Sequence, residues 1–188
     1  MKKKIKIFLY NPYPAIGGVD TTIKNFFQSL DNNYAIEYIT LKKTKRLKKT
    51  NINYTVINSS STFRSFFKIY KIFKEDTHEK KFFFSIQYFV NIWSIIFIKL
   101  LLKGKLFIYE VNHLNEFNYS NSIKEFIKKN IIKILIKILY RFPDIVASNS
   151  SELSYDLSKY VKRKVYTLYN PSFKKIIFRK KTYKLNNK

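Results

Sequence analysis

The chain has 188 residues with three glycines, four prolines and no cysteine, a length that fits one domain or at most two small ones. Its 37 lysines and arginines against 12 acidic residues give a net charge of +25, which excludes an acidic solvating chain. This charge predicts attraction to nucleic acid, an anionic membrane surface or a phosphorylated substrate. The lack of cysteine excludes a disulfide framework, a thiolate zinc site and a cysteine nucleophile.

Part of the charge has an explanation other than a binding partner. Lysine, isoleucine, phenylalanine, asparagine and tyrosine dominate the composition, and all five have A/T-rich codons. Drift of a genome toward A/T raises the lysine content without selection, although it does not account for the scarcity of acids. We therefore treat the charge as a supporting observation.

The first part of the chain alternates strand-like and helix-like segments. Its basic start is followed by an apolar run that is too short for a signal peptide, with no small-residue cleavage site, so we predict a strand at 4–10. Apolar residues at helical spacing predict a helix at 19–30. Further predicted elements are strands at 34–40 and 52–57, a solvated lysine-rich loop at 42–49 and a helix at 63–73.

The uncharged run 82–98 is the one segment that suggests a membrane span. It contains Ser, Gln and Asn and is shorter than the ~20 apolar residues that a span needs. We therefore divide it between a buried strand at 82–86 and a helix at 88–103.

The alternation continues to the end of the predicted domain. The predicted elements are a strand at 106–111, a polar loop at 112–121, a helix at 122–141, a strand at 144–147, a helix at 151–161 and a strand at 164–168. We predict a domain at 1–172, followed by a basic tail or the start of a linker at 173–188.

Strands that alternate with helices, with almost no hairpin signals, predict an α/β fold with a parallel sheet covered on both faces. Ligands of such sheets bind beyond the carboxyl ends of the strands. Three segments are predicted to lie there: 11–18, 112–116 and 148–151.

The predicted helix at 122–141 has a narrow basic stripe, and isoleucine and leucine fill most of its remaining circumference. The stripe consists of Lys129, Lys133 and Lys137. One interpretation is a core helix with one solvated edge. The other is a helix on an anionic bilayer, with its lysines reaching the headgroups.

Two of the three glycines, Gly17 and Gly18, are adjacent in the first strand-to-helix turn. Glycine lets a ligand approach the backbone, and the following helix end offers free N–H groups to an anion, although any tight turn also favours glycine. Asp20 lies in the first turn of the helix, where capping alone would explain it.

His113 directly follows the predicted strand at 106–111. An imidazole in that place suits acid/base chemistry or the binding of a hydroxyl group, and a loop histidine bonded to nearby backbone is the alternative. His78 lies in a charged loop, and we assign it no role. No metal-ligating constellation is visible.

In their order along the chain, several short motifs resemble the N-terminal domain of family 4 glycosyltransferases of the GT-B fold. Gly17 to Asp20 is similar to the family's GGxE-like turn, with Asp in place of the usual Glu, and His113 lies where the family carries a histidine. Residues 144–150 resemble its aDxviaxS segment, and 169–171 resemble the segment leading to its interdomain linker.

The resemblance implies a Rossmann-like, doubly wound domain and the transfer of a sugar from a nucleotide sugar, without a metal or cofactor. Gly17 and Gly18 would face the donor's phosphates or sugar, and His113 would polarise a sugar hydroxyl. The implied acceptor-side residues are Asp20, Asn112 and Ser148. A cell-envelope glycan or lipid-linked acceptor, on the cytoplasmic face of a membrane, would suit the basic and apolar surface.

The chain departs from the family's pattern in two places. Gln87 and its neighbours stand where many members have a histidine at a strand end, and no segment supplies the basic pair and E-x7-E motif of the nucleotide-binding half. The leading hypothesis is therefore the N-terminal domain of a transferase, either truncated or frameshifted, or completed by a separate C-terminal half. The alternatives are a non-catalytic, peripheral membrane-binding module and, with least support, charge-driven nucleic-acid binding.

Overall fold

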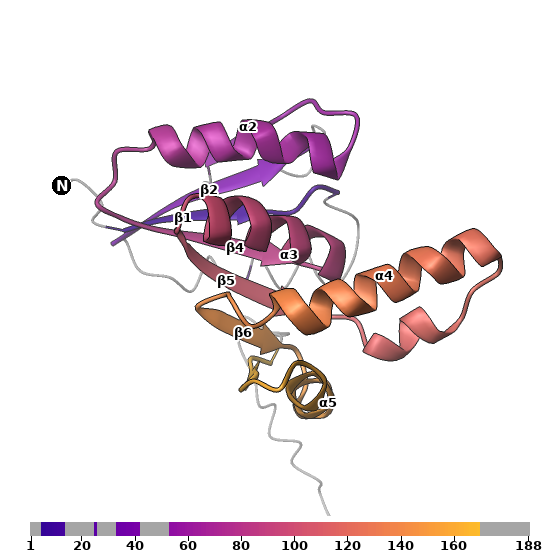
Figure 1. Ribbon diagram of the computed structural model, residues 1–188. Helices are drawn as coiled ribbons and strands as arrows, with labels where there is room; N and C mark the ends of the chain where they lie inside the picture. The colour runs from indigo at the N-terminus through magenta and orange to yellow at the C-terminus, as the bar shows by residue number, and fades with distance from the viewer. Residues whose placement is uncertain (1–4, 14–24, 26–32, 42–52, 170–188) are drawn as a thin grey trace, which may run out of the picture.

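A parallel sheet of seven strands forms the centre of the protein (Figure 1). The computed structural model describes residues 5–13, 25, 33–41 and 53–169. The strand order is β3-β2-β1-β4-β5-β6-β7. The strands are β1 (Ile5–Tyr10), β2 (Tyr34–Thr40), β3 (Asn53–Val56), β4 (Lys80–Ile86), β5 (Lys105–Glu110), β6 (Ile145–Ser148) and β7 (Tyr166–Thr167).

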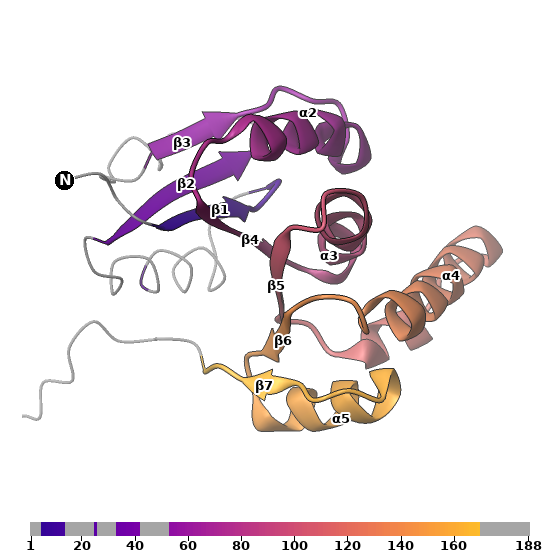
Figure 2. The same cartoon turned by 60° about the vertical axis from the view of Figure 1, so that its left-hand side comes forward.

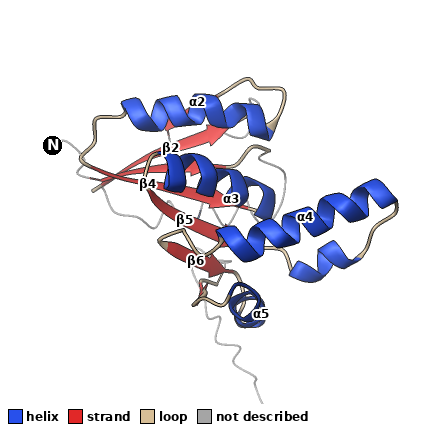
Figure 3. Cartoon of the chain, in the orientation of Figure 1, coloured by secondary structure: helices blue, strands red, loops and turns tan. Residues whose placement is uncertain are grey.

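Helices connect the strands that follow β3 (Figure 3). They are α2 (Thr62–Glu75), α3 (Tyr88–Ser94), the π-helix η2 (Ile95–Leu101), the 3₁₀ helix η3 (Leu114–Asn118), α4 (Ile123–Leu139) and α5 (Ser151–Val161). Ser61, Ser122 and Ser150 cap α2, α4 and α5, each accepting a hydrogen bond from the backbone N–H three residues further on. Such caps satisfy N–H groups that the first helical turn leaves without partners.

The apolar core lies mainly on one face of the sheet. Phe8 and Tyr10 of β1 point into it, and helices α2 to α5 lie on that side (Figures 1 and 2). Leu9, between them, belongs to a smaller apolar cluster on the other face. This alternation is the two-residue period of a strand, and it explains why β1 is apolar on both faces.

The predicted fold class is confirmed by the parallel pairing of all seven strands. Every strand predicted within the described residues is present, although the last is reduced to Tyr166–Thr167. The predicted helix 19–30 and the lysine-rich loop 42–49 lie outside the described residues. None of the described helices is long and apolar enough to cross a membrane.

Two segments differ from the prediction. The helix predicted at 88–103 is α-helical only to Ser94 and continues as η2. The N–H of Gly104 donates to the carbonyl of Ile98 at 2.8 Å, and a Cβ on Gly104 would lie 2.8 Å from the Phe73 ring. Glycine is therefore required where this helix turns back toward the sheet. The predicted loop 112–121 contains η3, which begins next to a histidine cap described below.

Asp144 ties the start of β6 to the neighbouring elements. Its carboxylate accepts hydrogen bonds from Lys99 Nζ at 2.8 Å, Lys105 Nζ at 3.1 Å and the backbone N–H of Leu106 at 2.9 Å. Partial burial on its own would raise the pKa of Asp144, but these hydrogen bonds lower it to about 2. A lowered carboxylate pKa means that this stabilisation is present above pH 4 and is lost as the pH falls toward 2.

The Asp144→Asn variant is therefore expected to be about 1–2 kcal/mol less stable at pH 7, a value that allows for solvent screening of a partly exposed group. Urea unfolding followed by circular dichroism measures this loss. The difference between variant and wild type should shrink at pH 3. Glu75→Gln, which removes an exposed carboxylate at 3.9 Å from Lys71, is the control and should change stability little. Equal stability of Asp144→Asn and wild type at pH 7 would contradict the assignment.

Candidate active site at the carboxyl edge of the sheet

The strand order reverses direction between β1 and β4, which makes this pair the topological switch point of the sheet. In open parallel sheets, ligands bind outside the carboxyl ends of the strands at such a point. Asn11 follows β1, Gln87 follows β4, and Asn112 and His113 follow β5. These residues, with Ser148 at the end of β6, mark the candidate site. The predicted donor-facing Gly17 and Gly18 and acceptor-side Asp20 lie outside the described residues.

His113 is held by hydrogen bonds at both ring nitrogens. Its Nδ1 accepts from the backbone N–H of Asn115 at 3.3 Å, which caps η3, and its Nε2 lies 3.0 Å from Oδ2 of Asp156 in α5. Because Nδ1 accepts, the hydrogen bonds fix the tautomer with the proton on Nε2, which donates to Asp156. His113 is 31% exposed, so a ligand can reach it, but contact with a sugar hydroxyl requires exchange of one of these bonds.

Asn112 lies at the surface beside His113 and is held by two contacts. Its carbonyl accepts a hydrogen bond from the Tyr88 hydroxyl at 2.8 Å, and its side-chain N–H donates to Glu116 at 2.9 Å. A tyrosine of α3 therefore holds the loop after β5 in place through its hydroxyl group. Asn112 is exposed and His113 is partly exposed, so these two adjacent predicted site residues can both be reached by a ligand.

Ser148 is positioned differently from these two residues. It is fully buried, and its hydroxyl lies 2.7 Å from the Ser154 hydroxyl and 3.2 Å from the Ser150 carbonyl. The side chain thus links the end of β6 to α5. It has no surface to offer an acceptor in this conformation.

A buried carboxyl group that the sequence analysis did not identify lies directly below the candidate site. Glu110, the last residue of β5, has no exposed surface; its Oε1 accepts from Asn91 Nδ2 at 2.7 Å and from the Tyr140 hydroxyl. Ser85 at the end of β4 extends the cluster by donating to Asn91 Oδ1 at 2.6 Å. Within the described residues, Glu110 Oε2 has no hydrogen-bond partner.

Burial raises the pKa of Glu110 to about 8, although the hydrogen bonds from Tyr140 and Asn91 oppose this shift. Burial and the neighbouring Glu110 likewise raise the pKa of Tyr140 well above its usual value. The carboxyl group is therefore mostly protonated at neutral pH. The only sign of this buried acid in the sequence is the glutamate that ends the apolar run LFIYE.

Gln87 has a backbone conformation that non-glycine residues seldom adopt, with φ 79° and ψ 140°. Its N–H donates to the Tyr109 carbonyl at 3.3 Å, and its carbonyl accepts from the Asn91 N–H at 2.8 Å, which starts α3. Its side chain is exposed at the end of β4. Backbone strain costs about 1–3 kcal/mol and tends to occur at ligand sites. The sequence singled out Gln87 only as a departure from a family pattern.

The lysines of the predicted membrane-facing stripe do not share one environment. Lys129 donates to the Tyr119 carbonyl and pairs with Glu125 at 2.7 Å, and Lys133 donates to Asn118 Oδ1 at 3.1 Å. Both therefore hold α4 against the segment that contains η3. Lys137 is exposed.

The interpretation of this helix as a core helix with one solvated edge is wrong. Ile136 is the only fully buried residue of α4. The helix projects past the carboxyl ends of the strands, so much of its apolar surface meets no other described element (Figure 1).

The described residues contain no group of three or more acidic or histidine side chains able to hold a metal ion. At the carboxyl edge of the sheet, the side chains of His113, Asn112 and Gln87 are exposed or partly exposed and can form hydrogen bonds with a ligand. Such groups suit a ligand rich in hydroxyls.

No protein-family model matches the sequence, and no curated protein matches it. Solved structures do match the fold. The chain is similar to HepE of Anabaena in complex with UDP and glucose, with a TM-score of 0.63 and 12% identity over 88% of this chain and 44% of HepE. The HepE complex with UDP-glucose gives a TM-score of 0.64 and 13% identity over 88% and 43% of the two chains.

Sucrose-phosphate synthase of Thermosynechococcus elongatus is a further match, with a TM-score of 0.56 and 11% identity over 87% of this chain and 47% of the synthase. The chain thus spans less than half the length of either protein. At these identities the likeness concerns the fold alone. The described part of the chain therefore shares the fold of the matched part of these structures, an α/β domain built on a parallel sheet.

Proposed function

We propose that the chain is the acceptor-side half of a glycosyltransferase that moves a sugar from a nucleotide sugar to a cell-envelope glycan or a lipid-linked acceptor. The observation that carries the proposal is the similarity in fold between 88% of this chain and 44% of HepE, a protein whose structure is in complex with UDP and glucose. The motifs that resemble family 4 transferases, including the histidine after β5, lie in the matching order along the sequence.

The proposed chemistry is metal-independent transfer with a divided site. The Nε2–H of His113 would donate a hydrogen bond to a hydroxyl of the transferring sugar in place of its bond to Asp156, and Asn112 would contact the acceptor. Gly17 and Gly18 would approach the donor's diphosphate, and Asp20 would contact the acceptor side. We propose that domain 1–172 needs a separate C-terminal half to complete the donor site, and that the pair acts on the inner face of the membrane.

The test is transfer of radiolabelled sugar from a panel of UDP- and GDP-sugars to a membrane-lipid extract, by the full chain with and without a segment encoded downstream that contains E-x7-E. Transfer is expected only from the mixture. His113→Ala should lower the rate about fivefold to hundredfold because it removes one hydrogen bond to the transferring sugar.

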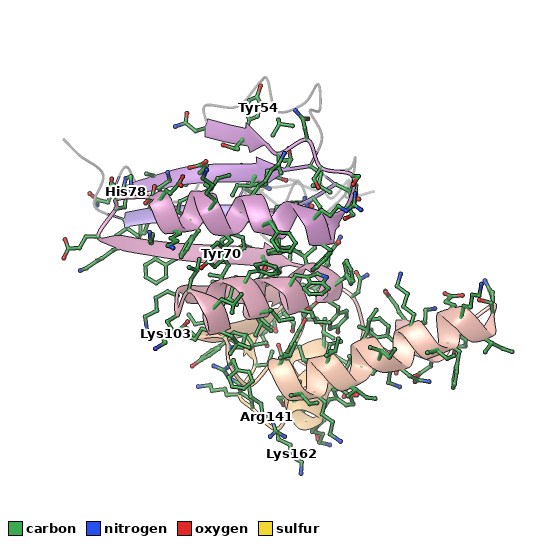
Figure 4. The ribbon with its side chains drawn as sticks, turned by 45° about the horizontal axis from the view of Figure 1, so that its top comes forward. Tyr54, Tyr70, His78, Lys103, Arg141 and Lys162 are labelled. Atoms are coloured by element: carbon green, nitrogen blue, oxygen red, sulfur yellow. The ribbon has the colours of Figure 1, made fainter. Side chains whose placement is uncertain are left out.

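His78→Ala is the matched control for this experiment. His78 lies just before β4, at the amino-terminal edge of the sheet and away from α4 (Figure 4), where its ring bonds to Asp76 at 3.1 Å. The rate should be unchanged by this variant. No transfer by the mixture with any donor, or equal rates for His113→Ala and His78→Ala, would count against the proposal.

A peripheral membrane-binding module without catalysis is the second candidate. It is favoured by one observation, the exposed isoleucines of α4. Membrane binding alone does not distinguish the two candidates, because a transferase half with a lipid-linked acceptor also needs a membrane surface; the transfer assay does.

A further inference from the structure

The outward side of α4 carries a continuous row of exposed isoleucines. Ile127, Ile131, Ile134 and Ile138 are each 52–57% exposed, and Ile123 at the start of the helix is 80% exposed. Their spacing of three and four residues places them on one side of the helix. We call the row of Ile123, Ile127, Ile131, Ile134 and Ile138 the outer stripe. It is roughly 22 Å long at 1.5 Å per residue.

The opposite side of α4 accounts for its attachment to the domain. Ile136 is buried in the main core, and the Lys133 carbonyl accepts a hydrogen bond from the Tyr160 hydroxyl of α5 at 3.0 Å. Lys129 donates to the Tyr119 carbonyl, which lies outside the helix. The outer stripe therefore does not turn inward by a simple rotation of the helix, because these contacts fix which side faces the domain.

Exposed lysines border the outer stripe on both sides. By helical geometry, Lys124 and Lys128 lie along one side and Lys137 along the other, and all three are exposed. An apolar row between cationic borders is the pattern of a helix that lies in the interface of an anionic bilayer, where the apolar side chains enter the acyl region and the lysines reach the headgroups.

The charge distribution selects among the occupants of this surface. If a second copy of the chain bound to the outer stripe, the lysines of the two copies would face each other, and two chains of net charge +25 would repel. An anionic bilayer is complementary both to the apolar row and to its borders. We propose that the outer stripe, with Lys124, Lys128 and Lys137, docks this protein on an anionic lipid bilayer.

Docking in this way places the candidate site next to the headgroups. The N-terminal half of α4 projects beyond the carboxyl ends of the strands, which is the edge that carries His113 (Figure 1). A lipid-linked acceptor would then meet the site without leaving the bilayer; this last step rests on the proposed transferase function, whereas the docking itself does not.

The test is flotation of the purified full chain with vesicles of phosphatidylcholine and phosphatidylglycerol, at 0.1 M salt, compared with phosphatidylcholine alone. Wild type should float with the anionic vesicles. The double variant Ile127→Gln/Ile134→Gln leaves the charge unchanged and should lower the partition constant about tenfold or more. The control Phe67→Gln changes an apolar side chain of α2 that is 57% exposed, and it should bind as wild type does.

A second pair of variants isolates the lysine borders. Lys124→Gln/Lys128→Gln should lower partitioning about fivefold per lysine, whereas Lys71→Gln/Lys74→Gln removes two exposed charges from α2 and should have a clearly smaller effect. Circular dichroism checks that each variant is folded.

Three results would overturn the inference: no flotation of wild type, wild-type flotation of Ile127→Gln/Ile134→Gln, or equal losses for the two lysine pairs. Self-association that disappears in the isoleucine variant, without vesicle binding, would show instead that the outer stripe joins two copies. The assay contains no sugar donor, so its failure leaves the transferase proposal standing. Vesicle binding that survives every α4 variant would leave the general membrane-module hypothesis standing and refute this surface.

Discussion

Replacing Glu110 with glutamine is expected to remove most of a fall in stability that the wild-type protein shows between about pH 5 and pH 8. The pKa of Glu110 is raised by burial from 4.5 to about 8 in the folded state. A folded-state pKa above the unfolded one means that full stability is present below about pH 4.5 and is lost as the pH rises toward 8. At about 1.4 kcal/mol per pH unit, the wild type should lose roughly 3–4 kcal/mol over this range.

Urea unfolding at pH 5, 6.5 and 8, followed by far-ultraviolet circular dichroism, measures the effect. The quantity compared between variants is the slope of the free energy of unfolding against pH, so contributions from the many surface lysines cancel. Glu79→Gln, at an exposed position just before β4, should keep the wild-type slope. The variant Tyr140→Phe removes a hydrogen-bond donor that lowers the pKa of Glu110, so it should make the fall in stability with rising pH steeper. Identical slopes for wild type and Glu110→Gln would refute the assignment of a neutral buried carboxyl group.

The second large effect is expected from the aromatic core under α2. Phe66 has no exposed surface and lies between the rings of Tyr10, at 5.3 Å, and Phe97, at 5.7 Å. Truncation to alanine removes these contacts and leaves a cavity that a packed core fills only in part. The Phe66→Ala variant should be about 3–5 kcal/mol less stable.

The adjacent Phe67 provides the matched control, because it has the same side chain on the same helix and is 57% exposed. Its alanine variant should lose about 1 kcal/mol or less, mainly from edge contacts with Phe63 and Phe97. Thermal melts of the two variants side by side make the comparison. Similar losses for both would mean that α2 packs on the sheet with a different face.

The positions of the strands along the chain and their parallel direction were predictable because each strand is a short apolar run between polar segments. Because a helix follows most strands, the chain can return to the same end of the sheet before each next strand, and the strands then pair in parallel. The extents of β1 and β2 differ from the prediction by no more than a residue. Periodicity identifies such elements because burial on both faces imposes the pattern directly.

The surroundings of the candidate site residues were not predictable in the same way. His113 was placed correctly after β5, but its partner Asp156 comes from α5, and only the fold brings the two together. The cluster of Glu110, Asn91 and Tyr140 joins three elements that no local pattern relates. Helical periodicity also could not tell which apolar side of α4 faces the core, because isoleucine occupies both sides.

The central position of β1 has a consequence for how this chain folds during synthesis. Ile5 pairs with Tyr34 of β2 on one side and with Lys80 of β4 on the other, so one edge of β1 stays unpaired until a much later segment has been synthesised. Until β4 leaves the ribosome, the unpaired backbone N–H and C=O groups along this edge of β1 are open to pairing with other chains, which is a recognised aggregation hazard. Closure of that long loop also makes folding slow, because its entropy is lost before the pairing forms. The nascent chain is therefore most exposed to aggregation while the residues between β2 and β4 are being made.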